Sequence, residues 1–224
     1  MLDKEALDYV TSRLSFWDKL DSDEKNILSN NITKINYRKG SKLYSKNGEC
    51  LGVLLVHTGE LRVYILSEDG RDVTLYRILE GDLCVLSASC VLNSITFDVE
   101  IEAEVDTEVY LLNIQAFSKL TSQNIYVENF AYKNAIERFS DVMWSMEQIL
   151  FMRFDKRLAI FLLDEMAKNN SYDLNLTQEQ IAKYVGSARE VVSRMLKVFQ
   201  SQGILEQSRG AIHIIDRDKL MALI

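Results

Sequence analysis

The chain has 224 residues, of which 47% are hydrophobic, and its formal net charge is −7. This length suggests one or two domains, and the apolar content supports a sizeable buried core and excludes a disordered chain. No apolar run reaches the ~18–20 residues that span a bilayer, and the acidic first ten residues do not resemble a signal or transit peptide. We therefore expect a soluble, cytoplasmic protein with no membrane partner.

The charge is unevenly distributed along the chain. Residues 1–154 hold 16 Lys and Arg against 24 Asp and Glu, whereas residues 155–224 hold 10 against nine. An acidic body is therefore followed by a near-neutral C-terminal segment. The three cysteines exclude a disulfide framework, and together with His57 and His213 they have no spacing typical of a zinc site. We predict no metal and no cofactor, and leave any effector unknown.

Glycine positions and alternating residues predict a β-roll in the first half of the chain. Six of the nine glycines fall between Gly40 and Gly81, where they mark tight turns. The intervening segments are rich in Val, Ile, Leu and Tyr, as expected of short strands. They are Gly52–Thr58, Glu60–Leu66, Val73–Leu79 and Ile95–Leu112. The Asp-Gly pair within Ser67–Arg71 predicts a hairpin turn.

Residues 125–153 form a predicted long helix with two adjacent apolar stripes. One stripe, at heptad spacing, consists of Tyr132, Ile136, Phe139, Met143, Met146 and Leu150. Its neighbour consists of Ala131, Ala135, Arg138, Val142, Ser145, Ile149 and Met152. Two stripes fit two partners, the β-roll and a second subunit, so we favour a homodimer. The alternative is one broad apolar face buried within a monomer.

The last seventy residues have the pattern of a helix-turn-helix with a wing. A helix over Asp155–Lys168 and an extended Tyr172–Leu176 lead to a capping box in which Thr177 is the N-cap and Gln180 its partner. Gly186 supplies the turn. A second capping box, from Ser187 to Glu190, is predicted to open the helix Arg189–Gln202. Ile204–Glu206 and Ile212–Ile215 then predict a two-stranded wing around the turn Ser208–Gly210.

The second helix of this module divides into an apolar and a polar face. At about 100° per residue, Val192, Met195, Leu196 and Phe199 fill one arc. The opposite arc holds Arg189, Glu190, Ser193, Arg194 and Lys197. Arg pairs with guanine and Glu accepts from cytosine in the DNA major groove, so this face is a candidate for reading bases. The alternative is an ordinary amphipathic helix with a solvated charged face.

The order of roll, long helix and winged helix-turn-helix resembles the cyclic-AMP receptor/fumarate-nitrate regulator (CRP/FNR) family of bacterial transcription factors. The stretches that carry the resemblance are Tyr37–Gly40, Gly59–Val63, Gly81–Leu83 and Leu176–Arg194. It implies an α+β fold, with a β-roll sensor domain and N-terminal helices over 1–123, a dimerisation helix over 124–153 and a DNA-binding domain over 154–224. It also implies a homodimer on palindromic double-stranded DNA, with RNA polymerase as a partner.

The same resemblance places the base-reading positions on Arg189, Glu190, Ser193 and Arg194, and implies a TGA core in each half-site. Lys197 and the wing residue Arg209 are better placed for phosphate. The full set of expected DNA-binding residues is Thr177, Gln178, Ser187, Arg189, Glu190, Ser193, Arg194, Lys197 and Arg209.

The sensory half departs from the cyclic-nucleotide branch of the family. That branch has a Gly-Glu pair after the position of Gly81-Asp82 and a later Arg-Ser pair, whereas here Cys84–Cys90 and Thr96-Phe97 occupy those places. No Lys or Arg occurs between Arg77 and Lys119, and a buried phosphate without a cation is costly. We therefore do not expect cyclic AMP to be the effector. The candidate effector pocket consists of Leu86, Ser87, Ser89, Cys90, Phe97, Val142 and Met143.

Other sensing chemistries and an enzyme are less well supported by the residues. Three cysteines cannot supply the four thiolates of an iron–sulfur cluster, and His57 lies outside the expected haem pocket. Cys84 and Cys90 are either a thiol-based redox sensor or small core residues. A regulator with no effector, its pocket closed by side chains, is a further alternative. A β-roll enzyme needs several metal ligands, and only His57 is available, so we expect no enzyme.

Overall fold

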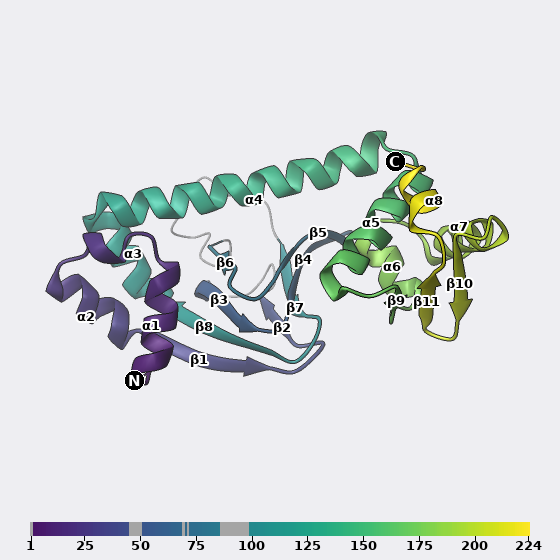
Figure 1. Cartoon of the computed structure of the whole chain (residues 1–224). Helices are drawn as coiled ribbons and strands as arrows, with labels where there is room; N and C mark the ends of the chain where they lie inside the picture. Colours follow the sequence, from purple (N-terminus) through teal and green to yellow (C-terminus); the bar gives the residue numbers. More distant parts are fainter. Residues whose placement is uncertain (1, 45–50, 69, 71, 86–98) are drawn as a thin grey trace. The chain divides into compact units, whose positions relative to one another are not determined.

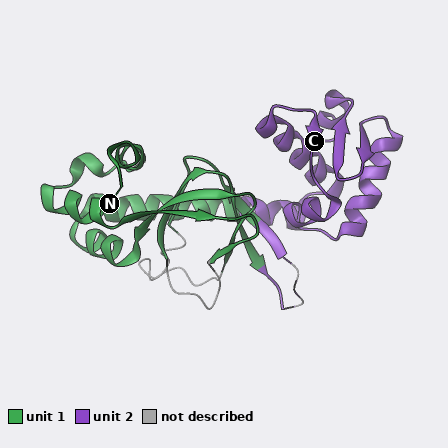
Figure 2. Cartoon of the chain, turned by 90° about the horizontal axis from the view of Figure 1, so that it is seen from below, with its two compact units in different colours: residues 1–65, 75–142 green, residues 66–74, 143–224 purple. Residues whose placement is uncertain are grey.

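The computed structural model describes residues 2–44, 51–68, 70, 72–85 and 99–224, and the chain divides into two compact units (Figures 1 and 2). The first unit comprises Met1–Ile65 and Leu75–Val142, and the second comprises Leu66–Thr74 and Met143–Ile224. The long helix α4 (Ile125–Phe151) contributes residues to both units.

Two four-stranded sheets form the β-roll of the first unit. The first sheet has the order β1-β8-β3-β6 and the second has the order β2-β7-β4-β5. The strands are β1 (Ile32–Tyr37), β2 (Lys42–Tyr44), β3 (Gly52–Thr58), β4 (Leu61–Leu66), β5 (Asp72–Ile78), β6 (Leu83–Cys84), β7 (Glu100–Ala103) and β8 (Thr107–Asn113). Alternate apolar residues of both sheets meet in one core, including Leu54, Val63, Ile101 and Val109, each at most 3% exposed.

The strand predictions agree well with this sheet arrangement, and the α+β fold class is confirmed. Gly52–Thr58 is β3 as predicted, and the segment that begins at Glu60 forms a strand from Leu61. The described part of the predicted segment Ile95–Leu112 contains two strands, β7 and β8. The chain bends between them at 104–106, where the apolar Val105 is exposed between two acidic residues.

Helices cover one end of the roll and share a second core with it. They are α1 (Lys4–Arg13), the 3₁₀ turn η1 (Trp17–Lys19), α2 (Ser22–Asn30), α3 (Ile114–Gln123) and the start of α4. Helices α1, α2 and α3 begin at side-chain caps, since Asp3 accepts from the Ala6 N–H, Asp21 forms a capping box with Glu24, and Asn113 accepts from the first turn of α3. Leu28, Phe117 and Val127 are at most 1% exposed in this core.

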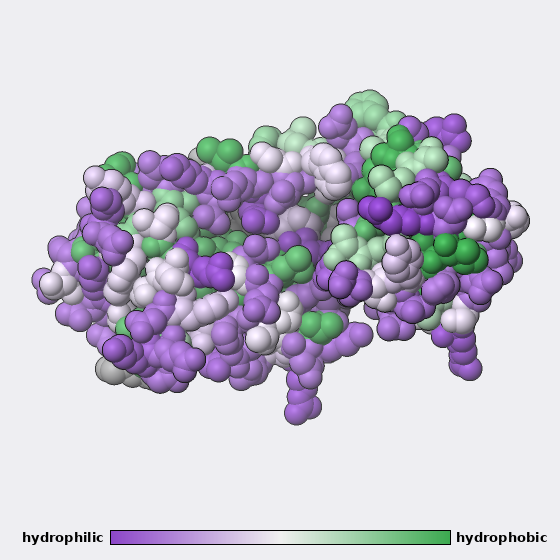
Figure 3. Space-filling view, in the orientation of Figure 1, coloured by the Kyte–Doolittle hydropathy of each residue, from purple (hydrophilic) through white to green (hydrophobic). Residues whose placement is uncertain are grey.

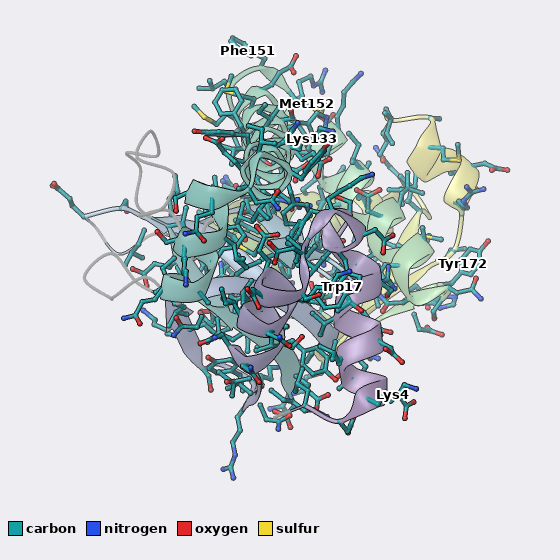
Figure 4. All side chains as sticks on the ribbon, turned by 90° about the vertical axis from the view of Figure 1, so that its left-hand side faces the viewer. Lys4, Trp17, Lys133, Phe151, Met152 and Tyr172 are labelled. Atoms are coloured by element: carbon teal, nitrogen blue, oxygen red, sulfur yellow. The ribbon has the colours of Figure 1, made fainter. Side chains whose placement is uncertain are left out.

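The two stripes of α4 differ in exposure. All six residues of the heptad stripe are exposed, with fractions from 44% at Met146 to 65% at Ile136 and Leu150. In the neighbouring stripe Ala131 is fully buried and Val142 packs against the roll. Figure 3 shows hydrophobic surface along the upper edge, where α4 runs in Figure 1. At its end Phe151, 82% exposed, projects outward (Figure 4). One stripe of α4 therefore packs, and the other lacks cover in a single chain.

The second unit is built around the helix-turn-helix. Its elements are α5 (Phe154–Asn169), β9 (Asp173–Leu174), α6 (Gln178–Tyr184), α7 (Arg189–Ser201), β10 (Leu205–Ser208), β11 (Ala211–Ile214) and α8 (Arg217–Met221). The three strands form a sheet with the order β10-β11-β9. The predicted two-stranded wing is confirmed as the hairpin of β10 and β11. The extended segment at Asp173 and Leu174 pairs with His213 and Ile212 and adds the third strand.

One of the two predicted capping boxes is present. The Thr177 hydroxyl accepts from the Gln180 N–H at 3.2 Å, and Gln180 Oε1 accepts from the Thr177 N–H at 2.9 Å. The second box was a wrong prediction, because α7 has Ala188 as its N-cap and no side-chain cap. The Ser187 N–H donates to the Ala182 carbonyl at 2.9 Å, so Ser187 closes the turn after α6 and does not start α7.

Gly186 makes the turn between α6 and α7 and has a φ of +59°. An added Cβ would lie 3.1 Å from Ile149 Cδ1 and 3.4 Å from Val73 Cγ1. The left-handed backbone and this close packing both favour glycine here. Within the same unit the Thr74 hydroxyl donates to the Lys183 carbonyl at 3.1 Å, and Lys183 Nζ lies 3.6 Å from Asp72 Oδ2.

Candidate nucleic-acid interface

Helix α7 presents one buried and one open face. Val192, Leu196 and Phe199 are at most 1% exposed and pack in the core of the second unit. On the opposite side, Arg189, Glu190, Arg194 and Lys197 are exposed and Ser193 is partly exposed. The spacing of positions 190, 194 and 197 places them on one face of the helix. The arcs assigned from the sequence therefore correspond to the packed and solvent-facing sides.

A cleft of about 410 Å³ separates the beginning of the helix-turn-helix from the wing. Its walls include four of the expected DNA-binding residues, namely Thr177, Gln178, Arg189 and Arg209. Arg209 is exposed in the turn between β10 and β11, next to Gly210 with φ +78°. The structure thus brings a cation from α7 and a cation from the wing to the same cleft, although they are twenty positions apart in sequence.

The other expected residues lie outside this cleft. Glu190, Ser193, Arg194 and Lys197 lie along the open face of α7, where a groove of DNA has room to approach. Ser187 lies in the turn before α7 and is partly exposed. The candidate interface therefore has two parts, the open face of α7 and the cleft beside the wing.

Sequence reasoning missed Gln200 and Gln207 in this region. Gln178 Nε2 donates to Gln207 Oε1 at 3.1 Å, and Gln207 Nε2 donates to Gln200 Oε1 at 3.0 Å. These side chains come from α6, β10 and α7, so no local spacing in the sequence marks the set. A side-chain hydrogen-bond chain of this kind is visible only once the wing is folded against the helices.

The expected effector pocket is only partly within the described residues. Leu86, Ser87, Ser89, Cys90 and Phe97 lie outside them. Val142 is partly buried and packs against the core of the roll, whereas Met143 is 47% exposed and belongs to the outward stripe of α4. Cys84 is fully buried in that core. Its burial favours the core interpretation over a reactive thiol for this cysteine.

The sequence pattern places Arg138 in the second stripe of the long helix but does not predict its contact with a tyrosine of the roll. The Arg138 guanidinium of α4 lies 5.3 Å from the ring centroid of Tyr76, and its Nη1 is 2.9 Å from Asp141 Oδ2. Tyr76 is 8% exposed, and its burial, with a smaller contribution from Cys84, raises the pKa of its hydroxyl well above the ordinary value. The sequence has no Lys or Arg between Arg77 and Lys119, and this cation comes from α4 instead.

Across the ranges that the structure describes, no group of three His, Cys, Asp or Glu side chains is arranged to hold a metal ion. Over the same residues, no helix has the length and apolarity required to cross a membrane.

Comparison with known protein families matches both halves of the chain. Residues 34–124 match the cyclic nucleotide-binding domain, and residues 156–223 match the Crp-like helix-turn-helix domain. The order of a sensor-type domain and a DNA-binding domain defines a class of transcription regulators with two functional parts.

Solved and curated relatives agree with this class. A structure described as a regulator of the crp/fnr family from Eubacterium rectale is 41% identical, with a TM-score of 0.91, and the alignment covers 95% of this chain and 98% of that one. The transcriptional activator protein anr of Pseudomonas aeruginosa is 23% identical over 193 residues, which are 83% of this chain and 78% of that protein. The cAMP-activated global transcriptional regulator Vfr of the same species is 21% identical over 179 residues, covering 75% and 83%.

The chain belongs to the Crp/Fnr family of transcription regulators. These relatives are regulators and not enzymes, so the expectation that the chain is not an enzyme is confirmed by the comparisons.

Proposed function

We propose that the chain acts in the cytoplasm as a homodimeric, sequence-specific transcription regulator that reads a palindromic DNA site through α7. The observation that carries the proposal is the division of α7. One face is buried in the module core, and the other presents exposed Arg, Glu and Lys side chains beside a cleft with a second arginine from the wing. This arrangement fits an α-helix in the major groove with the wing against the backbone.

The residues divide into two roles. Arg194 and Glu190 read base edges within the TGA core of each half-site, with Ser193 and Arg189 beside them. Lys197 and Arg209 contact phosphates, and Thr177, Gln178 and Ser187 provide further polar contacts with the backbone of the DNA. RNA polymerase is the partner through which such a dimer would act on transcription.

The homodimer is supported by the outward stripe of α4. Its six large apolar side chains lie in a continuous row, each between 44% and 65% exposed. Single exposed apolar residues are ordinary, but a row at heptad spacing is typical of a helix that pairs with a second helix. In the proposed dimer the same stripe of a second copy packs against it, so the dimer carries two α7 helices, one for each half of a palindromic site.

The signal that controls the dimer acts at the β-roll, and we do not propose cyclic AMP. The sequence has neither the Gly-Glu pair after Gly81-Asp82 nor the later Arg-Ser pair that hold the nucleotide in the cyclic-nucleotide branch of the family. A regulator without a small-molecule effector is the second candidate, favoured by the packing of Val142 into the core of the roll. Calorimetry with cyclic AMP checks the first statement, and binding with a micromolar or tighter dissociation constant would overturn it.

The reading role of α7 is tested by removing one charge. Arg194→Ala is expected to cost about 1–3 kcal/mol per half-site and to relax discrimination at one guanine. Arg217→Ala removes the same charge from an exposed position on α8 and is the matched control, with no expected loss of discrimination. Titrations against intact and guanine-substituted duplexes give the measurement. Unchanged discrimination in Arg194→Ala would show that α7 is not the reader.

A further inference from the structure

Three glutamine amides connect α6, α7 and the first strand of the wing. Gln178, the first residue of α6, donates to Gln207 in β10, and Gln207 donates in turn to Gln200 in the last turn of α7. The two distances are 3.1 and 3.0 Å. Gln207 is therefore the central residue, and its side chain uses its acceptor and its donor at the same time.

The three amides orient together. Turning the Gln207 amide alone by 180° would place its NH₂ against the NH₂ of Gln178 and its oxygen against the oxygen of Gln200. Both hydrogen bonds would then be lost, so the side chain of Gln207 is held in place by both of its neighbours. The side chains of Gln178 and Gln207 are also partly buried, which limits competition from water.

Fixing Gln207 also fixes the wing tip. Gln207 pairs with Ile212 and Ser208 pairs with Ala211, so only the turn of Arg209 and Gly210 lies beyond the last paired residues. Arg209 follows Gln207 by two positions on the same short hairpin. Because β10 has four residues, a strand anchored at Gln207 leaves little length over which the tip can shift.

The position of the wing tip matters for the function proposed above. Arg189 and Arg209 line the same cleft as Gln178 and Gln207. The DNA phosphate that binds Arg209 and the base edges that contact α7 belong to the same duplex. Their separation is therefore fixed by the geometry of the DNA. The distance between the wing and α7 therefore decides whether both contacts form together.

We propose that Gln207 is a positioning residue that holds the wing and its phosphate-contacting Arg209 at the spacing that a DNA backbone requires. The proposal rests on the DNA-binding function proposed above. Gln207 acts through Arg209 and makes no base contact, so it contributes to affinity for all sequences and not to the choice between them.

The test uses the full-length chain, a duplex that this chain has selected from random DNA, and a scrambled duplex. The slope of log binding constant against log salt concentration is negative, and in Arg209→Ala its magnitude should decrease by about 1.8 units, since each dimer loses two contacts of about 0.9 unit. Gln207→Leu should decrease the magnitude of this slope by about one to two units while leaving discrimination between selected and scrambled duplexes unchanged. In the Arg209→Ala background, Gln207→Leu should change affinity by less than about twofold.

Gln202→Leu is the matched control, because it removes an exposed amide just after α7, and its slope should equal that of the wild type. If Gln207→Leu lowers the thermal unfolding midpoint, Gln200→Leu is used in its place. This variant removes only the hydrogen bond between Gln207 and Gln200, and Gln200 is an exposed helical residue. The positioning role would be overturned if the variant used keeps the salt slope of the wild type. It would also be overturned if its loss of affinity adds to that of Arg209→Ala, or if it no longer discriminates between the selected and scrambled duplexes. Failure of the wild type to prefer the selected duplex would instead contradict the proposed function.

Discussion

Tyr64 of β4 illustrates how single residues of the roll respond to their charged neighbours. It is 3% exposed, and the buried guanidinium of Arg62 lies 3.9 Å from its ring centroid. Arg62 in turn lies 2.8 Å from Glu104 and 3.5 Å from Glu102. Burial, with a further contribution from Glu102, raises the pKa of the Tyr64 hydroxyl to about 12, although Arg62 acts in the opposite direction.

This shift predicts a pH dependence of stability. Below pH 10, the ordinary pKa of tyrosine, the Tyr64 hydroxyl is neutral in the folded and in the unfolded chain. Its contribution to the free energy of unfolding is then fully present. Between pH 10 and about 12 the unfolded chain ionises while the folded chain stays neutral, so this contribution is lost as the pH rises. Tyr64→Phe removes the group, so the difference in unfolding free energy between wild type and variant should be constant below pH 9.5 and then shift against the wild type.

Urea unfolding of both proteins between pH 8 and 12 measures this difference. Tyr172→Phe, at a tyrosine that is 50% exposed, is the matched control for the loss of one hydroxyl. A difference for Tyr64→Phe that stays flat up to pH 12 would contradict the assigned role of burial.

The sequence predicted which residues share a helix face, but not which side chains from different elements contact each other. The exposed polar face of α7 followed from its spacing, because a helix places every third or fourth residue together. The contact of Arg138 with Tyr76 joins residues that are dozens of positions apart. The hydrogen bonds of Gln207 join residues of three different elements. Such contacts depend on how sheets and helices pack, and no single-sequence pattern marks them.

Among the elements, α4 was anticipated both in extent and in the division of its stripes. The sequence predicted a helix over 125–153, and the structure has Ile125–Phe151. Glycine and proline are absent from this stretch, so nothing interrupts the heptad pattern. The start of α7 was misjudged for a local reason, because Ser187 uses its N–H to close the preceding turn and leaves Ala188 as the N-cap.

The exposed stripe of α4 makes a prediction about assembly. Met143→Glu places a carboxylate in the proposed seam, and each dimer would bury two of them without partners. We expect the dimer to weaken by about 3 kcal/mol or more, which raises its dissociation constant at least about 100-fold. Sedimentation at micromolar concentration measures the change.

Ser140→Glu adds the same charge at an exposed polar position of α4 outside the stripe and should leave the dimer intact. A wild-type chain that sediments as a monomer at micromolar concentration would refute the seam directly.

For the whole molecule, the net charge constrains how DNA is bound. The chain carries −7, and residues 155–224 hold only one more cationic than acidic residue. Phosphate attraction supplies most non-specific affinity, so a module of this charge binds arbitrary DNA weakly. In the function proposed above, selectivity comes from base contacts by α7 and from the spacing of two modules, about 34 Å apart on one DNA face for successive major grooves.

Selection of binding sites from a pool of random duplexes by the full-length chain tests the central claim most directly. A symmetric dimer that reads DNA through two copies of α7 should enrich an inverted repeat containing TGA and its complement, with half-site centres one helical turn apart. Enrichment of a single, unrepeated sequence, or no enrichment over the starting pool, would contradict the account.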